Sequence, residues 1–257
     1  MTESSESAVN PSAAVTSAPE PADPVELAGV TDEVRATLVL ALDVDDLVVA
    51  TRMARELAPW FGVAKVGLEL YSAAGPDAVA AMRELGYDVF LDLKLHDIPT
   101  TVGRAARVLG ALGVDYLTLH AFGGVDMLRA GVEGLGEGAT NAGLEIPMAV
   151  AVTVLTSDGG APDHIVPQRV RLAAEAGCGG LVCAAKDLVD ARTLAPRLVR
   201  IVPGIRLAGS EANDQANPAT PGDAMAQGAD LLVIGRTVTA APDPAEAANQ
   251  LVSELLG

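Results

Sequence analysis

Asp92 and Lys94 stand two residues apart within a short apolar run, and Asp97 follows just beyond it. Side chains two apart on a β-strand point to the same face, so a strand here would bring this carboxylate and this ammonium together. Pro99 can begin a helix, which would hold Asp97 close to the same end of the strand. The three side chains are therefore expected to form a charged cluster at one edge of a sheet.

Lys65 lies in the preceding apolar run and would add a second ammonium to this cluster. A structural ion pair at the end of a strand would account for Asp92 and Lys94, but it would not explain why Lys65 joins them. Carboxylates beside an ammonium favour its protonated form. A protonated lysine can donate a proton, whereas Schiff-base formation requires a neutral amine, so the cluster favours protonation of a developing carbanion.

Eight short apolar runs recur after residue 34, and amphipathic segments rich in Ala, Leu and charged residues separate them. Near-continuous apolar strands joined by helices are typical of a parallel sheet covered by helices, and eight such units predict a single-domain α/β protein, a (β/α)8 barrel. An open doubly wound sheet is the alternative. The predicted strands are Thr37–Asp43, Val63–Gly67, Val89–Lys94, Tyr116–His120, Met148–Thr153, Gly180–Cys183, Val199–Pro203 and Leu231–Gly235.

Charged residues stand at the ends of several of these runs, which is where the active site of a (β/α)8 barrel lies. Asp43 ends the first predicted strand, Arg206 follows the seventh, and Gly235 with Arg236 ends the eighth. Backbone N–H groups and a guanidinium after the last strand are the usual phosphate site of barrel enzymes. We therefore expect a phosphate group to bind there.

A long polar segment, Leu207 to Thr220, follows Arg206 and contains Gln215. Loops of this length are uncommon in a compact domain unless they serve a function. We expect this segment to be a lid over the ligand.

The chain is acidic, because 17 Lys and Arg against 34 Asp and Glu among 257 residues give a formal charge of −17. A negative field of this size repels nucleic-acid backbones and anionic membrane surfaces, so we expect neither partner. The longest apolar run without a charge, Ile146 to Ser157, is too short to span a bilayer, and no basic residue precedes Arg35 to begin a signal peptide. We expect a cytoplasmic protein.

Residues 1–33 contain seven acidic residues and four prolines, but no basic residue and no apolar periodicity. A segment of this composition cannot bury enough apolar surface to fold, so we expect a disordered acidic tail. The barrel is then expected to occupy residues 34–257.

Three further features receive no function in this interpretation. Cys178 and Cys183 have no second pair and no nearby His, which favours two buried thiols over a zinc site or a disulfide framework. Gly134–Gly138 does not follow a predicted strand, so it is not a nucleotide loop, and we expect it to end a helix. His96 and His120 are expected to have packing or supporting roles.

The segment from Asp92 to Thr101 closely resembles the hallmark of the orotidine 5′-phosphate decarboxylase family, Asp-x-Lys-x-x-Asp-Ile-Pro-x-Thr. The resemblance covers about residues 36 to 255. Further matches follow in the family's order, and they are Ala41-Leu42-Asp43, Lys65-Val66-Gly67, His120-Ala121, Val152 to Ser157, Val202 to Arg206, Asp214-Gln215 and Ile234-Gly235-Arg236.

The resemblance implies roles for the charged cluster. Asp43 and Lys65 resemble the family's ligands of the ribose hydroxyls, and Lys65 also belongs to the charge network. Asp92 is similar to the carboxylate beside the C6 carboxyl group of the substrate. Lys94 is similar to the residue that donates a proton to C6.

The resemblance also implies a homodimer with shared active sites, because Asp97 matches an aspartate that reaches into the neighbouring subunit's site together with Ile98 and Thr101. The remaining substrate contacts that it implies are Thr156 at the pyrimidine ring, Gln215, Gly235 and Arg236 at the phosphate, and Arg206.

The reaction implied is the decarboxylation of orotidine 5′-phosphate to uridine 5′-phosphate and CO2, the last step of UMP synthesis, without metal, flavin or pyridoxal. Lys94 would stabilise and protonate the carbanion, and Asp92 would raise the energy of the ground state. The alternatives are a Mg²⁺-dependent decarboxylase of sugar-phosphate keto acids in the same barrel family, a Schiff-base aldolase acting through Lys94, and a barrel that binds a nucleotide phosphate without catalysis.

Overall fold

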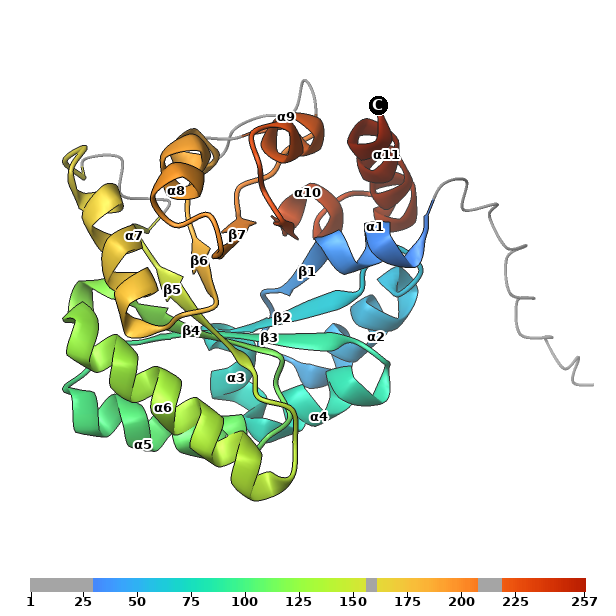
Figure 1. The fold of residues 1–257 in the computed structure, drawn as a ribbon. Coiled ribbons are helices and arrows are strands. Elements are labelled where there is room, and N and C mark those ends of the chain that lie inside the picture. The colour runs from blue at the N-terminus through green and yellow to red at the C-terminus, as the bar shows by residue number, and fades with distance from the viewer. Residues whose placement is uncertain (1–29, 156–160, 208–218) are drawn as a thin grey trace, which may run out of the picture.

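The computed structural model describes residues 30–155, 161–207 and 219–257, and its centre is a closed barrel of eight parallel strands in the order β1 to β8 (Figure 1). The predicted (β/α)8 barrel is therefore confirmed, and the open sheet is wrong. The strands are β1 (Leu38–Leu42), β2 (Val63–Gly67), β3 (Asp88–Leu95), β4 (Tyr116–His120), β5 (Met148–Val152), β6 (Gly180–Val182), β7 (Val199–Val202) and β8 (Leu231–Ile234).

The strand boundaries differ from the predicted ones mostly at the last predicted residue, which lies just beyond the end of the strand. β1, β5, β6, β7 and β8 each end one residue earlier than predicted, whereas β2 and β4 match and β3 is longer at both ends. Pro203, for example, has no N–H to donate to a neighbouring strand, so β7 ends at Val202. These final residues therefore lie on the rim of the barrel.

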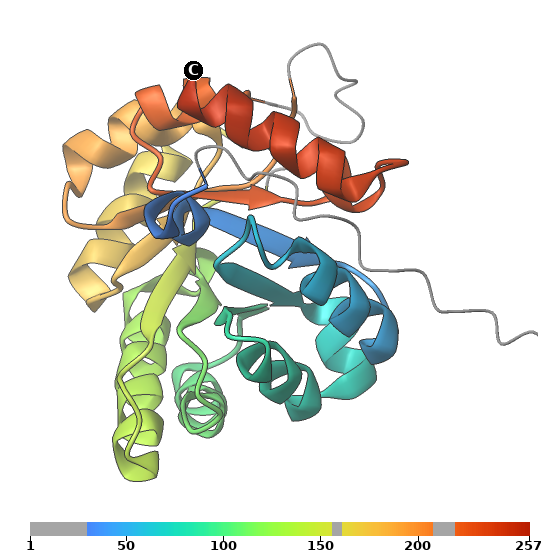
Figure 2. The ribbon, with the colours of Figure 1, turned by 90° about the vertical axis from the view of Figure 1, so that its right-hand side faces the viewer.

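Helices cover the outside of the barrel (Figure 2). Several begin as their sequences predict, because Pro occupies the first position of α4, α5, α9 and α11, and the Asp46 carboxylate accepts hydrogen bonds at the start of α2. The helices are α1 (Asp32–Thr37), α2 (Leu47–Leu57), α3 (Leu68–Ala74), α4 (Pro76–Glu84), α5 (Pro99–Gly110), α6 (Gly124–Ala142), α7 (Ile165–Ala176), α8 (Leu188–Leu194), α9 (Pro221–Ala226), α10 (Arg236–Thr239) and α11 (Pro244–Leu256), with short 3-10 turns η1 (Ala121–Gly123) and η2 (Ala185–Asp187).

The core has two layers, which the alternation of strand side chains separates. Leu38, Leu40 and Leu42 of β1 belong to the layer between the barrel and its helices, whereas Val39 and Ala41 belong to a second cluster inside the barrel. That inner cluster also contains Val63, Phe90, Val150, Ile201, Leu231 and Val233. The interior is thus packed with side chains, which leaves room for a site only at its mouth.

Gly134–Gly138 lies in the middle of α6, so the prediction that it ends a helix is wrong. A Cβ atom on Gly134 would overlap the carbonyl oxygen of Gly103, and one on Gly138 would overlap that of Arg107, both on α5. α5 and α6 run side by side at the edge of the molecule in both views (Figures 1 and 2). These glycines therefore permit close contact between two helices, which local sequence alone does not reveal.

The predicted domain boundary at residue 34 falls inside α1, because that helix begins at Asp32 after its N-cap Thr31. Residues 1–29 of the predicted tail lie outside the described residues. In the described part of the chain, no helix is long and apolar enough to cross a membrane. Cys178 and Cys183 are unpaired and buried as predicted, and burial raises the pKa of both thiols to about 12.

Candidate active site

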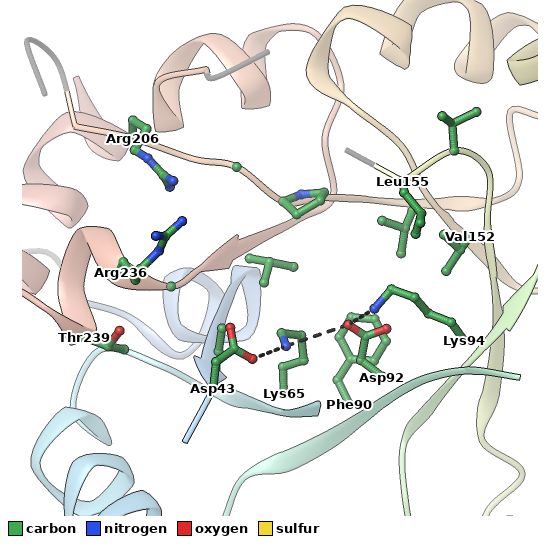
Figure 3. A pocket seen from close by; sticks show the side chains of 17 residues that line it. Asp43, Lys65, Phe90, Asp92, Lys94, Val152, Leu155, Arg206, Arg236 and Thr239 are labelled. Atoms are coloured by element: carbon green, nitrogen blue, oxygen red, sulfur yellow. Dashed lines mark hydrogen bonds and ion pairs between the residues drawn. The ribbon is translucent and has the colours of Figure 1, made fainter. Parts of the chain in front are cut away.

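A cavity of about 480 Å³ opens at the carboxyl ends of the strands, where the sequence places the charged residues (Figure 3). Its lining comes from β1, β2, β3, β5, β6 and β8 and from residues that follow strands, including those just after β7. Apolar side chains form much of the wall, among them Phe90, Val152, Val182 and Val233, which the sequence interpretation did not assign to the site. They could have been found only by knowing which strand residues point inward.

Four charged side chains form an alternating row along one side of this cavity, in the order Asp43, Lys65, Asp92, Lys94 (Figure 3). The Lys65 Nζ lies 2.9 Å from Asp43 Oδ1 and 3.7 Å from Asp92 Oδ2, and the Lys94 Nζ lies 2.9 Å from the same Asp92 Oδ2. The structure therefore brings together Asp92, Lys94 and Lys65 of the predicted cluster and adds Asp43 to them, but Asp97 is not among them. We call these four residues the charge row.

The middle of the charge row is the most deeply buried part. The side chains of Lys65 and Asp92 are 11% and 13% exposed, whereas those of Lys94 and Asp43 are 32% and 61% exposed. Charges in such a partly desolvated place interact more strongly than they would in water. Lys94, at the end of the row, can present its ammonium to a ligand in the cavity.

Asp92 and Lys94 lie together on β3, but the strand bulges there, so the regular strand that the sequence interpretation assumed does not hold. Leu91 pairs with Leu117 of β4, but Leu95 pairs with Leu119, so the register shifts between them. Lys94 has a φ of 49°, in the left-handed region that residues with a Cβ rarely adopt. Bulges of this kind re-aim side chains beside active sites.

Arg206 and Arg236 line the other end of the cavity, and Figure 3 shows both guanidiniums turned towards it. Arg206 is only 8% exposed, and its Nη1 donates to the carbonyl oxygen of Ile205 at 2.9 Å and to Thr237 Oγ1 at 3.3 Å. Gly235 also lines the cavity. Two guanidiniums beside the last strand suit a doubly charged phosphate group.

Asp97, Ile98 and Thr101 are exposed and do not line the cavity of their own chain. The Asp97 Oδ1 accepts a hydrogen bond from the Ile98 N–H at 2.6 Å, and no ion pair between described residues involves this carboxylate. The structure of one chain therefore does not bring these three residues to the charge row.

Two of the predicted contacts, Thr156 and Gln215, lie outside the described residues, as does most of the predicted lid. Only the ends of that segment, Leu207 with Ala219 and Thr220, are described. The N–H of Arg206 donates to the carbonyl oxygen of Ala219 at 2.9 Å, which holds the two ends of the segment together beside the cavity.

His96 and His120 lie next to each other on the rim, with ring centroids 5.8 Å apart, and neither lines the cavity. The His120 Nδ1 accepts a hydrogen bond from the N–H of Phe122 at 3.2 Å, and the ring of His96 contacts that of Phe122. Burial lowers the pKa of His120, and the positive charge of Arg169 lowers it further. These contacts agree with the packing role expected for both histidines.

Among residues 30–155, 161–207 and 219–257, no three His, Cys, Asp or Glu side chains are grouped as metal ligands would be.

Comparisons with known proteins agree on one family. The family model described as "Orotidine 5′-phosphate decarboxylase / HUMPS family" matches residues 36–251. A protein of Thermobifida fusca named orotidine 5′-phosphate decarboxylase is 45% identical over 233 residues, covering 86% of this chain and 96% of the relative. One of the same name from Moorella thermoacetica is 43% identical, covering 85% and 91%. The crystal structure of orotidine 5′-phosphate decarboxylase from Lactobacillus acidophilus matches with a TM-score of 0.72 and 31% identity, covering 86% of this chain and 99% of that one.

Proposed function

This chain belongs to the orotidine 5′-phosphate decarboxylase / HUMPS family, and we infer from its cavity how it decarboxylates orotidine 5′-phosphate to uridine 5′-phosphate and CO2. The observation that carries the assignment of roles is the charge row, because it ends in an ammonium that faces the cavity beside a partly buried carboxylate. The pyrimidine ring is proposed to lie at Lys94 and Asp92, and the phosphate at Arg206 and Arg236.

In the proposed step the bond between C6 and its carboxylate breaks, CO2 leaves, and the electron pair remains on C6. A proton from Lys94 Nζ then forms the new C–H bond and leaves the lysine neutral until solvent protonates it again. The C6 carbanion has no adjacent electron sink, so stabilisation must come from a charge held in place beforehand. Asp92 holds that ammonium at 2.9 Å and, close to the departing carboxylate, disfavours the ground state.

Groups that do not react supply binding energy in this proposal. Asp43, at the other end of the charge row, and Lys65 beside it would bind the ribose hydroxyls. Arg206, Arg236 and Gly235, together with Gln215, would bind the phosphate. Binding at a part of the substrate that does not change can be used to hold C6 against Lys94, which lowers the barrier of the chemical step.

We propose further that two copies of the chain share their active sites. Asp97, Ile98 and Thr101 do not line the cavity of their own chain. Ile98 and Phe122 are 66% and 68% exposed, and the ring of Phe122 contacts that of His96, two residues before Ile98. Exposed apolar residues next to an active site favour an interface there.

A cytoplasmic location is also proposed, since both cysteines are unpaired.

The experiment that tests the reaction follows the ultraviolet spectrum of orotidine 5′-phosphate after addition of chelator-treated protein. Loss of the conjugated carboxylate should convert the spectrum to that of uridine 5′-phosphate. Activity that returns only with Mg²⁺ would favour a metal-dependent decarboxylase instead. A melting temperature raised by uridine 5′-phosphate, without any spectral change, would favour a barrel that only binds nucleotides.

The shared site is tested by mixing Asp97→Ala protein with Lys94→Ala protein, each inactive alone. A mixed dimer contains one site with both native residues, so random exchange in a two-fold dimer should restore about a quarter of the native activity. Subunit exchange without recovery would show that each site is built from one chain.

A further inference from the structure

The hydroxyl group of Thr118 on β4 connects the two residues at the reacting end of the charge row. It accepts a hydrogen bond from the backbone N–H of Lys94 at 2.7 Å and donates one to Asp92 Oδ1 at 3.0 Å. Thr118 is completely buried and does not line the cavity. It can therefore act on the reaction only through these two neighbours.

The bulge in β3 explains why a side chain is needed at this point. Between the pairs Leu91 with Leu117 and Leu95 with Leu119, β3 has the three residues 92–94 where β4 has only Thr118. The backbone N–H of Lys94 consequently has a side chain of β4, rather than a backbone carbonyl, as its acceptor. A buried N–H without any acceptor would be costly, so the Thr118 hydroxyl stabilises the bulged backbone.

The same hydroxyl orients the carboxylate of Asp92. Its Oδ1 receives the Thr118 hydrogen bond, whereas its Oδ2 faces the ammonium groups of Lys94 and Lys65 at 2.9 and 3.7 Å. Rotation of the carboxylate would break one set of contacts. Thr118 thus holds both the backbone from which Lys94 extends, at a φ of 49°, and the group that binds the end of its side chain.

We propose that Thr118 is a positioning residue for decarboxylation, which sets the place of the Lys94 ammonium relative to C6. This inference rests on the proposed function. A hydroxyl that served stability alone would leave the rate of each folded molecule unchanged, and so the two roles can be separated.

Thr153 offers a matched control, because it is a buried threonine just beyond the end of β5, the strand next to β4. It is 1% exposed, and its hydroxyl donates to the carbonyl oxygen of Val182 at 2.8 Å without contacting the charge row. Replacing Thr118 or Thr153 by Val removes one buried hydroxyl at nearly constant shape. Both changes should lower thermal stability, but only the first should disturb Lys94.

The experiment compares Thr118→Val, Thr118→Ser and Thr153→Val with native protein in steady-state decarboxylation. We expect kcat of Thr118→Val to fall about 100-fold, since misplacement of a reacting group by about 1 Å has an effect of that size. KM and the affinity for uridine 5′-phosphate should stay close to native values, because the phosphate contacts are intact. Thr118→Ser should recover most of kcat, and Thr153→Val should keep it.

A native kcat in Thr118→Val, an equal loss in Thr118→Ser, or the same loss in Thr153→Val would each overturn the positioning role. Should Thr118→Val fail to fold, Thr118→Cys makes the same comparison, because a thiol is only a weak donor and acceptor. Native protein that does not consume orotidine 5′-phosphate would instead refute the proposed function, so the two failures are distinguishable.

Discussion

The charge row and the α5–α6 contact both depend on a few residues that lie very close together, but for opposite reasons. In the charge row, large charged side chains meet at 2.9 Å because each ammonium has a carboxylate beside it. Between α5 and α6, the backbones meet because Gly134 and Gly138 have no side chain at all. The first arrangement gathers charge at the mouth of the barrel, and the second only stabilises the fold. Substitutions in the two regions should therefore separate rate from stability.

The largest effect is expected at the reacting end. Lys94→Ala should lower kcat by about 10⁴-fold, the upper range for loss of a general acid, because no other proton donor of the charge row faces C6. Thermal stabilisation by uridine 5′-phosphate should persist. Lys186→Ala, which removes a lysine outside the cavity, is the control and should keep native kcat. Substantial activity in Lys94→Ala would refute its role as the proton donor.

A second substitution within the cavity separates binding from chemistry. Arg236→Ala should raise KM by about 100-fold, because a hydrogen-bonded charge contact to the phosphate is lost. Arg236→Lys should recover part of that loss, since lysine restores the charge but not the two parallel hydrogen bonds of a guanidinium. Steady-state kinetics with Arg171→Ala, an exposed arginine of α7, provide the control. An unchanged KM would show that the phosphate lies elsewhere.

At the contact between α5 and α6, substitutions should change stability and leave the rate unchanged. Gly138→Ala should lower the free energy of unfolding by about 2–3 kcal/mol, because its Cβ would overlap the backbone of Arg107 and force the helices apart. The kcat of the folded fraction should remain native. On the same helix, the nearest atom to a Cβ on Gly136 is Ile146 Cγ2 at 3.7 Å, so Gly136→Ala should gain up to about 1 kcal/mol from helix propensity. Urea unfolding measures both, and equal effects would show that the contact is not tight.

The smallest effect is expected at His120, the last residue of β4. Burial first, and then the charges of Arg169, His96 and Lys94, lower its pKa below the ordinary value of 6.5. The unfolded chain therefore binds a proton more readily, and stability is lost as the pH falls through 6.5. His120→Asn keeps an acceptor for the Phe122 N–H, so it should show a shallower loss of melting temperature between pH 7 and pH 5. An unchanged slope would mean that His120 does not titrate differently on folding.

Much of the architecture could be predicted from the sequence because it depends on local patterns. The eight apolar runs correspond to the eight strands, and Pro99 begins α5 as its fixed φ requires. The meeting of Asp92, Lys94 and Lys65 was also predictable, since strands of a barrel end on one rim. The homologous motif extends these expectations to Asp97, Thr156 and Gln215, which remain predictions.

Features that depend on contacts between residues far apart in the sequence could be recognised only in the tertiary structure. In the sequence, Thr118 looks like any other strand residue. Only the structure shows that β3 bulges beside it and that Lys94, within the bulge, has a left-handed φ. The sequence of Gly134–Gly138 suggests the end of a helix, whereas the structure shows that these glycines let α5 pack closely against α6. Periodicity reports which face of an element is buried, but not the register between two elements. Here the register of β3 on β4 determines where the Lys94 ammonium lies.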